Sequence, residues 1–297
     1  MTDQRPETPP TVPLPLNTQL PFFAYGSLKA GEPAHDQISG FLADEPLPAA
    51  IPGTLWVRDG LPLLELAGAG QVEGFLLSFK TESAEHAYQT ICRFEPPKHY
   101  CWKESATLLE PSVRANVLVG KELERGRAAH LETNSWTLLD DPVFDSGLSV
   151  VRDVIKRDAK RVFDSAPPEH FDWPRFFRLQ MAYLLLWSAM ERYAALRFGA
   201  GLVPMAKIKK FGRHEVFRAA LKRAGVSRKD TVCDSRDPED SFALDASDPL
   251  SSILYYYQVR NNLSHRGKGA WADGEIVRKS LMELEAIFDA VLQGHGR

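Results

Sequence analysis

The sequence of 297 residues predicts an α+β protein in which a small β-rich module is followed by an all-helical module. Between residues 21 and 119 the apolar residues form short runs separated by Gly and Pro, which is typical of strands and turns. After residue 147 they recur every three or four positions, which is typical of helices. Net charge changes at the same point: residues 1–146 hold 11 Lys and Arg against 20 Asp and Glu, and residues 147–297 hold 25 against 19. This asymmetry favours two modules with different partners, although solvated helices also carry such surpluses.

The composition excludes several classes of protein. With 44% hydrophobic and 25% charged residues the chain is typical of globular proteins, and not of fibrous or disordered ones. Cys92, Cys101 and Cys233 are scattered and form no C-x-x-C pair, so we expect no disulfide framework, metal or cofactor. The longest apolar stretch, residues 181–190, is about half the length of a membrane span. We therefore expect a soluble, cytoplasmic protein without a membrane partner, because the N-terminus is acidic and proline-rich, unlike a signal peptide.

The β-rich module is expected over residues 21–140, after a flexible, proline-rich arm at residues 1–20. One helix fits TESAEHAYQTICRF, with Thr81 or Ser83 as its N-cap. The expected strands are PFFAYGSL, GTLWV, LPLLEL, VEGFLLSF, ATLLE and VRANVLVG.

The helical module is expected over residues 148–297, and the turn residues at 140–147 predict a linker before it. A second helix is expected to stop at Gly225, and the acidic segment 231–249 is expected to be a surface loop. The expected helices are FFRLQMAYLLLWSAMERYAALRF, HEVFRAALKRAG, SSILYYYQVRNNLSHR and GEIVRKSLMELEAIFDAVL.

Two features of the β-rich module predict a small-molecule site. A strand ending at Tyr25 is followed by Gly26, Ser27 and Leu28, a turn whose successive N–H groups can hold an anion. Glu95 follows the predicted helix and precedes two prolines that end it, so its carboxylate stands on a stiff corner suited to a general base. Taken singly, each feature also fits an ordinary turn or a solvated carboxylate.

The run FFAYGSLKAGEPAH resembles the opening of the γ-glutamylcyclotransferase-like (AIG2-like) family, which reads Y-G-[ST]-L followed by Gly and His, here Gly31 and His35. The resemblance continues in order through GTLW, VEGFLLSF and the segment that contains Glu95 and Tyr100, over roughly residues 20–120. It implies a small β-barrel-like fold with flanking helices.

The same resemblance implies the chemistry of the site. Tyr25, Gly26, Ser27, Leu28 and Tyr100 would bind the substrate, with the turn amides holding the α-carboxylate of a γ-glutamyl group. Glu95 would be the general base, because formation of 5-oxoproline requires the substrate's protonated α-amine to lose a proton before it attacks the γ-carbonyl. Neither a metal nor a cofactor is implied.

A second motif lies near the end of the tyrosine-rich helix, where the sequence reads Arg260-Asn261-Asn262-Leu263-Ser264-His265. These residues fit either a basic helix end stabilised by the helix dipole or a site that handles phosphate. The spacing of Arg260 and His265 resembles the R-x4-6-H signature of HEPN domains.

This second resemblance implies a metal-independent endoribonuclease whose active site forms across a homodimer. His265 would transfer protons at the ribose 2′-OH or the leaving oxygen, Arg260 would stabilise the phosphorane, and Asn261 would orient the phosphate. Glu191, in the long helix, would be an accessory acidic residue. The basic segment KIKKFGRH and the net charge of +6 favour RNA as the partner, although these lysines also fit a solvated helix face.

Three hypotheses follow from the two motifs. In the first, a γ-glutamyl or related ligand occupies the Glu95 pocket and the HEPN-like module cleaves or binds RNA, as in a toxin or defence effector. In the second, the chain is a γ-glutamyl-amine cyclotransferase and the helical module serves only for dimerisation. The third hypothesis is a binding protein without catalysis in either module.

Overall fold

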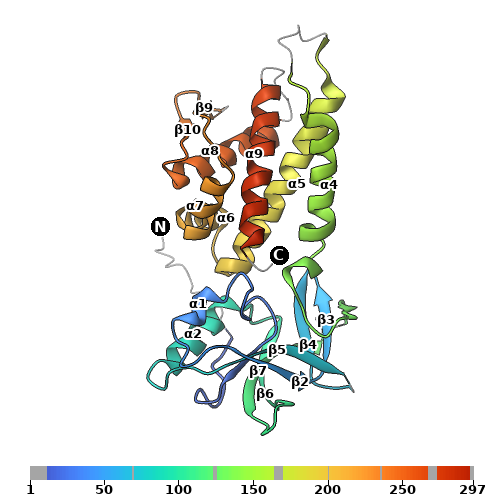
Figure 1. Cartoon of the computed structure of the whole chain (residues 1–297), viewed down its shortest axis with the longest axis vertical. Coiled ribbons are helices and arrows are strands. Elements are labelled where there is room, and N and C mark those ends of the chain that lie inside the picture. Colours follow the sequence, from blue (N-terminus) through green and yellow to red (C-terminus); the bar gives the residue numbers. More distant parts are fainter. Residues whose placement is uncertain are drawn as a thin grey trace, which may run out of the picture. The chain divides into compact units, whose positions relative to one another are not determined.

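The computed structural model describes residues 12–68, 70–122, 126–163, 170–199, 201–234, 236–266 and 273–294, with only the backbone at residues 265 and 266. The chain is a mixed α+β protein with a sheet-rich N-terminal half and a helical C-terminal half (Figure 1). Contacts divide it into two units, Met1–Pro142 with Ala195–Leu202, and Val143–Ala194 with Val203–Arg297. The expected modules of 21–140 and 148–297 remain predictions about independently folding domains.

Unit 1 is built on a five-stranded sheet in the order β2-β5-β1-β7-β6 and a three-stranded sheet in the order β4-β3-β8. In the first sheet β1 is antiparallel to β5, with Phe23 opposite Leu76, and parallel to β7, with Phe22 opposite Asn116. The elements are β1 (Phe22–Ala24), α1 (Asp36–Ser39), β2 (Leu47–Pro52), β3 (Thr54–Arg58), β4 (Leu61–Glu65), β5 (Gln71–Leu77), α2 (Ala84–Phe94), β6 (Tyr100–Ala106), β7 (Arg114–Gly120) and β8 (Ala129–His130).

The five-stranded sheet is open among the described residues, because β2 and β6 are its edge strands. A backbone hydrogen bond joins β2 to the turn just after β6, from Leu108 N to Ala50 O at 2.8 Å. The described strands therefore form a strongly curved sheet, and no closed barrel is found in them.

Both faces of this sheet are buried, as the alternation of side chains along a strand requires. Phe22 and Ala24 point into one core with Tyr88 and Ile91 of α2. Phe23 and Tyr25 point into the other core, which also holds Ile51, Val117 and Trp136. The predicted helix with Ser83 at its N-cap position is confirmed as α2.

Gly74 on β5 lets the central strands approach each other. A Cβ at Gly74 would lie 2.4 Å from Ala24 O and 2.8 Å from Phe23 Cζ. We expect Gly74→Ala to lower the free energy of unfolding by about 1–3 kcal/mol, because the strands must separate to accept the methyl group. Gly40→Ala is the matched control, because nothing lies within 4 Å of a Cβ there. Urea denaturation of both variants measures the difference, and equal losses of stability would contradict the close approach.

Residues 1–11 of the predicted flexible arm lie outside the described residues, and the arm's flexibility stays a prediction. From Val12 onward the chain packs on α2: Val12 is 1% exposed, and Tyr88 Oη donates to Leu20 O at 2.7 Å. Burial of one apolar side chain and paired backbone groups fix this segment despite its prolines. The run ATLLE contains only the last residue of β6 and then turns, and β2, β6 and β8 were not anticipated.

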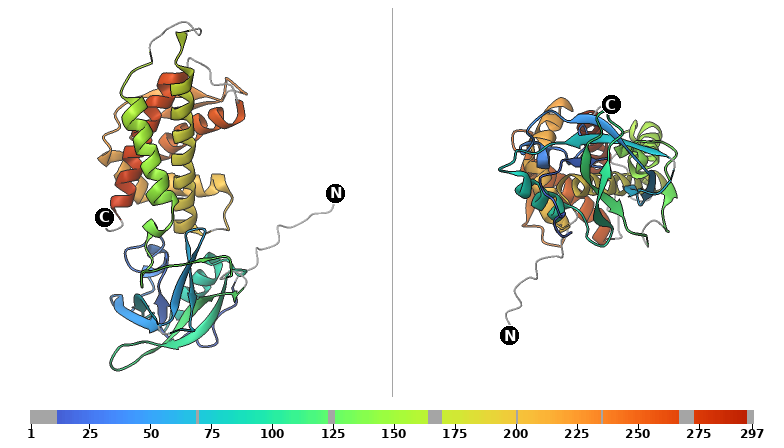
Figure 2. Two further views of the ribbon diagram at one scale, coloured as in Figure 1. Left: turned by 90° about the vertical axis from the view of Figure 1, so that its right-hand side faces the viewer. Right: turned by 90° about the horizontal axis from the view of Figure 1, so that it is seen from below.

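Unit 2 is mainly helical, and Figure 2 shows the short helix α4 lying alongside the long helices α5 and α9. Arg152 on α4 binds Glu285 and Asp289 of α9 at 3.0 and 2.8 Å, and the ring of Tyr193 on α5 packs edge-on against Phe288. None of the described helices combines the length and hydropathy needed to cross a bilayer. The elements are α4 (Leu148–Val154), α5 (Trp173–Phe198), α6 (Pro204–Arg213), α7 (Glu215–Arg223), β9 (Asp230–Cys233), β10 (Ser241–Leu244), α8 (Pro249–Arg266) and α9 (Gly274–Gln293).

The division between the two units, after Pro142, falls within the predicted linker at 140–147. This segment also contains a π-helical turn, Val143–Gly147, whose Phe144 is fully buried and packs near Phe288. One expectation for the helical half was wrong. The predicted surface loop at 231–249 contains the hairpin β9–β10, so the half is not all-helical. In both segments polar turn residues concealed a few apolar side chains that are buried by tertiary contacts. The predicted stop at Gly225 is confirmed by its positive φ of 66° after α7.

Candidate functional site

The turn after β1 presents three peptide N–H groups without an acceptor among the described residues. Lys29 N donates to Gly26 O at 3.0 Å and Ala34 N donates to Ser27 O at 2.9 Å, so the turn is closed through its carbonyl groups. The Nδ1 atom of His35 lies 3.0 Å from Leu28 O. By contrast, the N–H groups of Gly26, Ser27 and Leu28 donate no hydrogen bond to any described residue. Successive amides of this kind can bind a carboxylate.

Tyr25 fixes the start of this turn from inside the core. It is 4% exposed, and its hydroxyl donates to Leu118 O at 2.7 Å and accepts from Leu64 N at 3.3 Å. Burial, and next the Glu95 carboxylate, hold the pKa of Tyr25 well above its usual range. Glu95 therefore lies close enough to Tyr25 for their charges to interact, and the Tyr25 side chain positions backbone rather than facing an open pocket.

Glu95 directly follows α2, where its N–H donates to Ile91 O at 3.0 Å and its backbone turns to an extended conformation. The partly buried carboxylate accepts no hydrogen bond from the described residues. Burial raises its pKa to about 8. A carboxyl group without stabilising partners is a strong base when it is ionised, which suits proton abstraction near neutral pH.

Pro62 on β4 connects Tyr100 to the turn. The Tyr100 hydroxyl, which is buried, donates to Pro62 O at 2.9 Å. The ring of Pro62 covers Gly26 so closely that a Cβ there would lie 2.9 Å from Pro62 Cγ. The turn, Tyr25 and Tyr100 are thus joined through β4, which both tyrosines support, and Glu95 lies within reach of Tyr25 for their charges to interact.

Sequence reasoning missed the residues of β4 that make these contacts, Pro62 and Leu64. In the sequence they lie more than thirty positions after the Gly26–Leu28 turn and more than thirty positions before Glu95, and no local pattern marks them. It also missed Cys92, one helical turn before Glu95. Burial raises the pKa of Cys92, the Trp102 side chain lowers it, and Glu95 raises it. The sequence signal for Cys92 was its spacing of three residues from Glu95, which places the two side chains on neighbouring positions of a helix.

The second predicted site lies at the C-terminal end of α8, in the other unit. Arg260 and Asn261 are partly buried, and Arg260 Nη1 donates to Asn261 Oδ1 at 3.3 Å. His265 is in the last turn of α8, but its side chain lies outside the described residues. Asn262, which sequence reasoning did not single out, donates from Nδ2 to Cys233 O at 3.0 Å and ties α8 to β9.

Glu191 lies away from this end of α8. Gln180 of α5 contacts the motif directly, with Nε2 donating to Leu263 O at 3.1 Å. Glu191 is 11 residues further along the same helix, which corresponds to about 16 Å of rise. It accepts a hydrogen bond from Trp187 Nε1 at 2.8 Å, and it raises the pKa of Lys207 against the lowering effect of burial. The structure thus groups Glu191 with Lys207 rather than with Arg260, and its accessory role stays a prediction.

The fold and these sites describe an α+β protein with a sheet-rich and a helical half. No protein-family model matches the chain, and no curated protein matches it. Two solved structures are similar to part of it. The uncharacterized protein PH0828 from Pyrococcus horikoshii is 19% identical, with a TM-score of 0.32, and the match covers 39% of this chain and 89% of that one. YkqA from Bacillus subtilis is 13% identical, with a TM-score of 0.31, over 39% of each chain.

Proposed function

We propose that unit 1 is a γ-glutamylcyclotransferase-like module that releases 5-oxoproline from γ-glutamyl amines, with Glu95 as the general base. The observation that carries the proposal is a carboxyl group with a pKa of about 8 that interacts by charge with Tyr25, the residue before a turn with three amides that bind no described residue. The barrel-like fold of that family and the pocket expected around Glu95 belong to the same proposal.

The proposed reaction requires one proton acceptor and one site that binds a carboxylate. The turn amides bind the substrate's α-carboxylate, which brings the α-ammonium towards Glu95. Glu95 takes one proton from the α-ammonium, the resulting amine attacks the γ-carbonyl carbon, and the ring closes with two protons on its nitrogen. The bond from that carbon to the leaving amine then breaks as Glu95 passes its proton to the departing nitrogen. Glu95 then takes the second proton from the ring nitrogen, which completes the lactam, and releases it to the solvent. An α-amino group has a pKa near 8, so a base of similar pKa exchanges the proton with little free-energy cost.

The rate of this reaction should depend on pH through Glu95. Below its pKa of about 8 the carboxyl is protonated and cannot accept a proton. We therefore expect kcat/KM for 5-oxoproline release to rise about tenfold per pH unit up to about pH 8, and then to fall as the substrate's α-ammonium loses its own proton. Release from a γ-glutamyl amine, measured between pH 5.5 and 9, checks this. Glu104→Gln on β6 is the control and should keep the profile, whereas a rate that is flat below pH 7.5 would exclude Glu95 as the base.

The second candidate function concerns unit 2, which we propose to be a HEPN-like module that binds and cleaves RNA. Arg178 lies on α5, the helix whose Gln180 donates to Leu263 O of α8 beside the Arg260 motif. The side chains of Arg157 and Arg178 are 61 and 41% exposed and both pair with Asp158, and Lys279 is 46% exposed and pairs with Glu275. Because two arginines share one aspartate, a positive charge is left over, and it favours a polyanion, since phosphate contacts dominate affinity for nucleic acids.

An apolar stripe on α5 supports a homodimer. Phe177 and Met181 are 46 and 70% exposed, and Trp173 stacks on Phe177. These residues are spaced four apart, so they share a face of α5 beside Gln180, which contacts α8. Pairing of this stripe with that of a second copy would bring two Arg260 motifs together. If the dimer forms without RNA cleavage, the helical unit serves for assembly only, and the toxin or defence role stays without support.

A further inference from the structure

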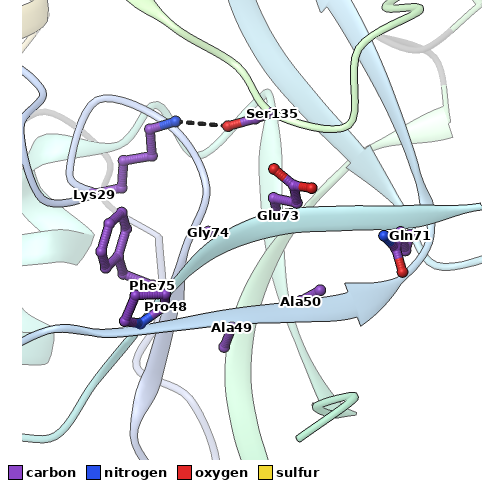
Figure 3. Close-up of a pocket in the computed structure, with 9 residues that line it drawn as sticks. All are labelled: Lys29, Pro48, Ala49, Ala50, Gln71, Glu73, Gly74, Phe75 and Ser135. Atoms are coloured by element: carbon purple, nitrogen blue, oxygen red, sulfur yellow. Dashed lines mark hydrogen bonds between the residues drawn. The ribbon is translucent and has the colours of Figure 1, made fainter.

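A hollow of about 360 Å³ lies in unit 1 beside the edge strand β2 and is lined by residues other than those of the Glu95 site. Its volume is within the range of small-ligand pockets. Figure 3 shows that Lys29 and Ser135 bound it on one side, with Glu73 on β5 facing the same space and Phe75 and Pro48 forming its apolar part.

Lys29 brings a buried positive charge to this hollow. The side chain is 7% exposed, and Nζ donates to Ser135 Oγ at 3.0 Å and to Trp136 O. Burial lowers the pKa of Lys29, while the Glu32, Asp140 and Glu73 carboxylates raise it. An ammonium group has three donors, so one remains for an acceptor in the hollow.

Glu73 supplies the opposite charge. Its backbone N–H donates to Asn134 O at 2.8 Å, which fixes β5 against the segment before Ser135. Its exposed carboxylate accepts no hydrogen bond from the described residues. The hollow therefore presents one ammonium donor and one carboxylate acceptor around an apolar floor.

We propose that this hollow binds the zwitterionic head of an apolar α-amino acid. The ligand's carboxylate accepts from Lys29 Nζ, its ammonium donates to Glu73, and its side chain lies against Phe75 and Pro48. A carboxylic acid without an amine is repelled by the carboxylates of Glu73, Glu32 and Asp140. An amine without a carboxylate is repelled by the Lys29 ammonium. Only a ligand that carries both charges satisfies both groups.

Leucine, 3-methylbutan-1-amine and 4-methylpentanoic acid test the proposal, because the amine lacks only the carboxylate of leucine and the acid lacks only its ammonium. Isothermal titration calorimetry of the full chain at pH 7.5 should give saturable binding of leucine, and binding weaker by about tenfold or more for the other two. Lys29 also anchors the turn to Ser135 and Trp136, so the variant is Glu73→Gln, which changes an exposed group. It should weaken leucine binding about tenfold or more.

Two further variants make the outcome specific. Glu85→Gln changes an exposed carboxylate of α2 that does not line the hollow, and it should bind leucine as the wild type does. Glu95→Gln should also leave leucine binding intact, which separates this site from the proposed catalytic one. Absence of saturable leucine binding, equal binding of the amine or the acid, or unchanged binding in Glu73→Gln would overturn the proposal.

Discussion

Replacing Glu95 with glutamine should abolish 5-oxoproline release from γ-glutamyl amines, with a loss of about 10²- to 10⁴-fold in kcat. Glutamine has nearly the same shape as glutamate but cannot take a proton from the substrate's α-ammonium. The turn amides at Gly26, Ser27 and Leu28 are unchanged by the substitution. We therefore expect KM to change little, and a steady-state assay with a γ-glutamyl amine separates the two effects.

Stability measurements distinguish this loss from a folding defect. The folded-state pKa of Glu95, about 8, lies above its ordinary value near 4.5, because burial disfavours the charge. Wild-type stability should thus fall as pH rises from about 4.5 to 8, since the unfolded chain ionises this group first. Glu95→Gln removes that cost, and at pH 8 it should be more stable by on the order of a few kcal/mol, given about 1.4 kcal/mol per pKa unit.

Thermal unfolding of both proteins at pH 5 and pH 8 checks the stability effect, with Glu104→Gln as the control for removal of a carboxylate. A variant that is inactive and also less stable at pH 8 would contradict a buried general base. An active Glu95→Gln enzyme would remove Glu95 from the mechanism. The substitution is expected to lower activity and to raise stability at pH 8, and both effects have one cause. A site that keeps a carboxyl group strongly basic also destabilises the fold.

Local patterns in the sequence predicted those elements whose side chains alternate or recur regularly. The strand around Phe23, the helix that ends before Glu95 and the long helix α5 all follow from such periodicity. The hairpin β9–β10 did not follow, because its strands have four residues each and lie among acidic turn residues. Val12 likewise lies in a proline-rich segment and is buried in a core cluster with distant residues such as Tyr88 and Ile91.

The candidate site was predictable only in part, for a similar reason. Gly26 and Glu95 carry local signals, a turn after a strand and a carboxylate at a helix end. Their connection depends on Pro62, which covers Gly26 and accepts from Tyr100, and such a contact has no sequence pattern. The two tyrosines were expected to bind substrate, but their hydroxyl groups bind the protein backbone, because a buried hydroxyl must satisfy its own hydrogen bonds first. Tyr25 and Tyr100 do so with backbone groups of β7 and β4.

RNA cleavage by the helical unit should be lost in Arg260→Ala and in His265→Ala, by about 10²-fold or more in each. An imidazole is needed to transfer protons between oxygen atoms, and a guanidinium is needed to stabilise the additional charge on the phosphorane. Arg218→Ala on α7 is the matched control, because Arg218 is also an arginine near the surface, with its side chain 60% exposed and paired with Glu215. Labelled RNA incubated with each protein in the presence of a chelator measures cleavage without free divalent metal.

Binding and assembly must be measured beside cleavage, because the basic end of unit 2 can hold RNA without cutting it. His265→Ala should bind RNA with the affinity and salt dependence of the wild type, whereas Arg157→Glu should weaken binding and reduce the salt slope. Met181→Glu places a charge on the apolar stripe of α5 and should give a monomer in analytical ultracentrifugation, with cleavage lost if two copies build the site. RNA left intact by the wild type would exclude a ribonuclease. Cleavage that persists in His265→Ala would move the chemistry to other residues.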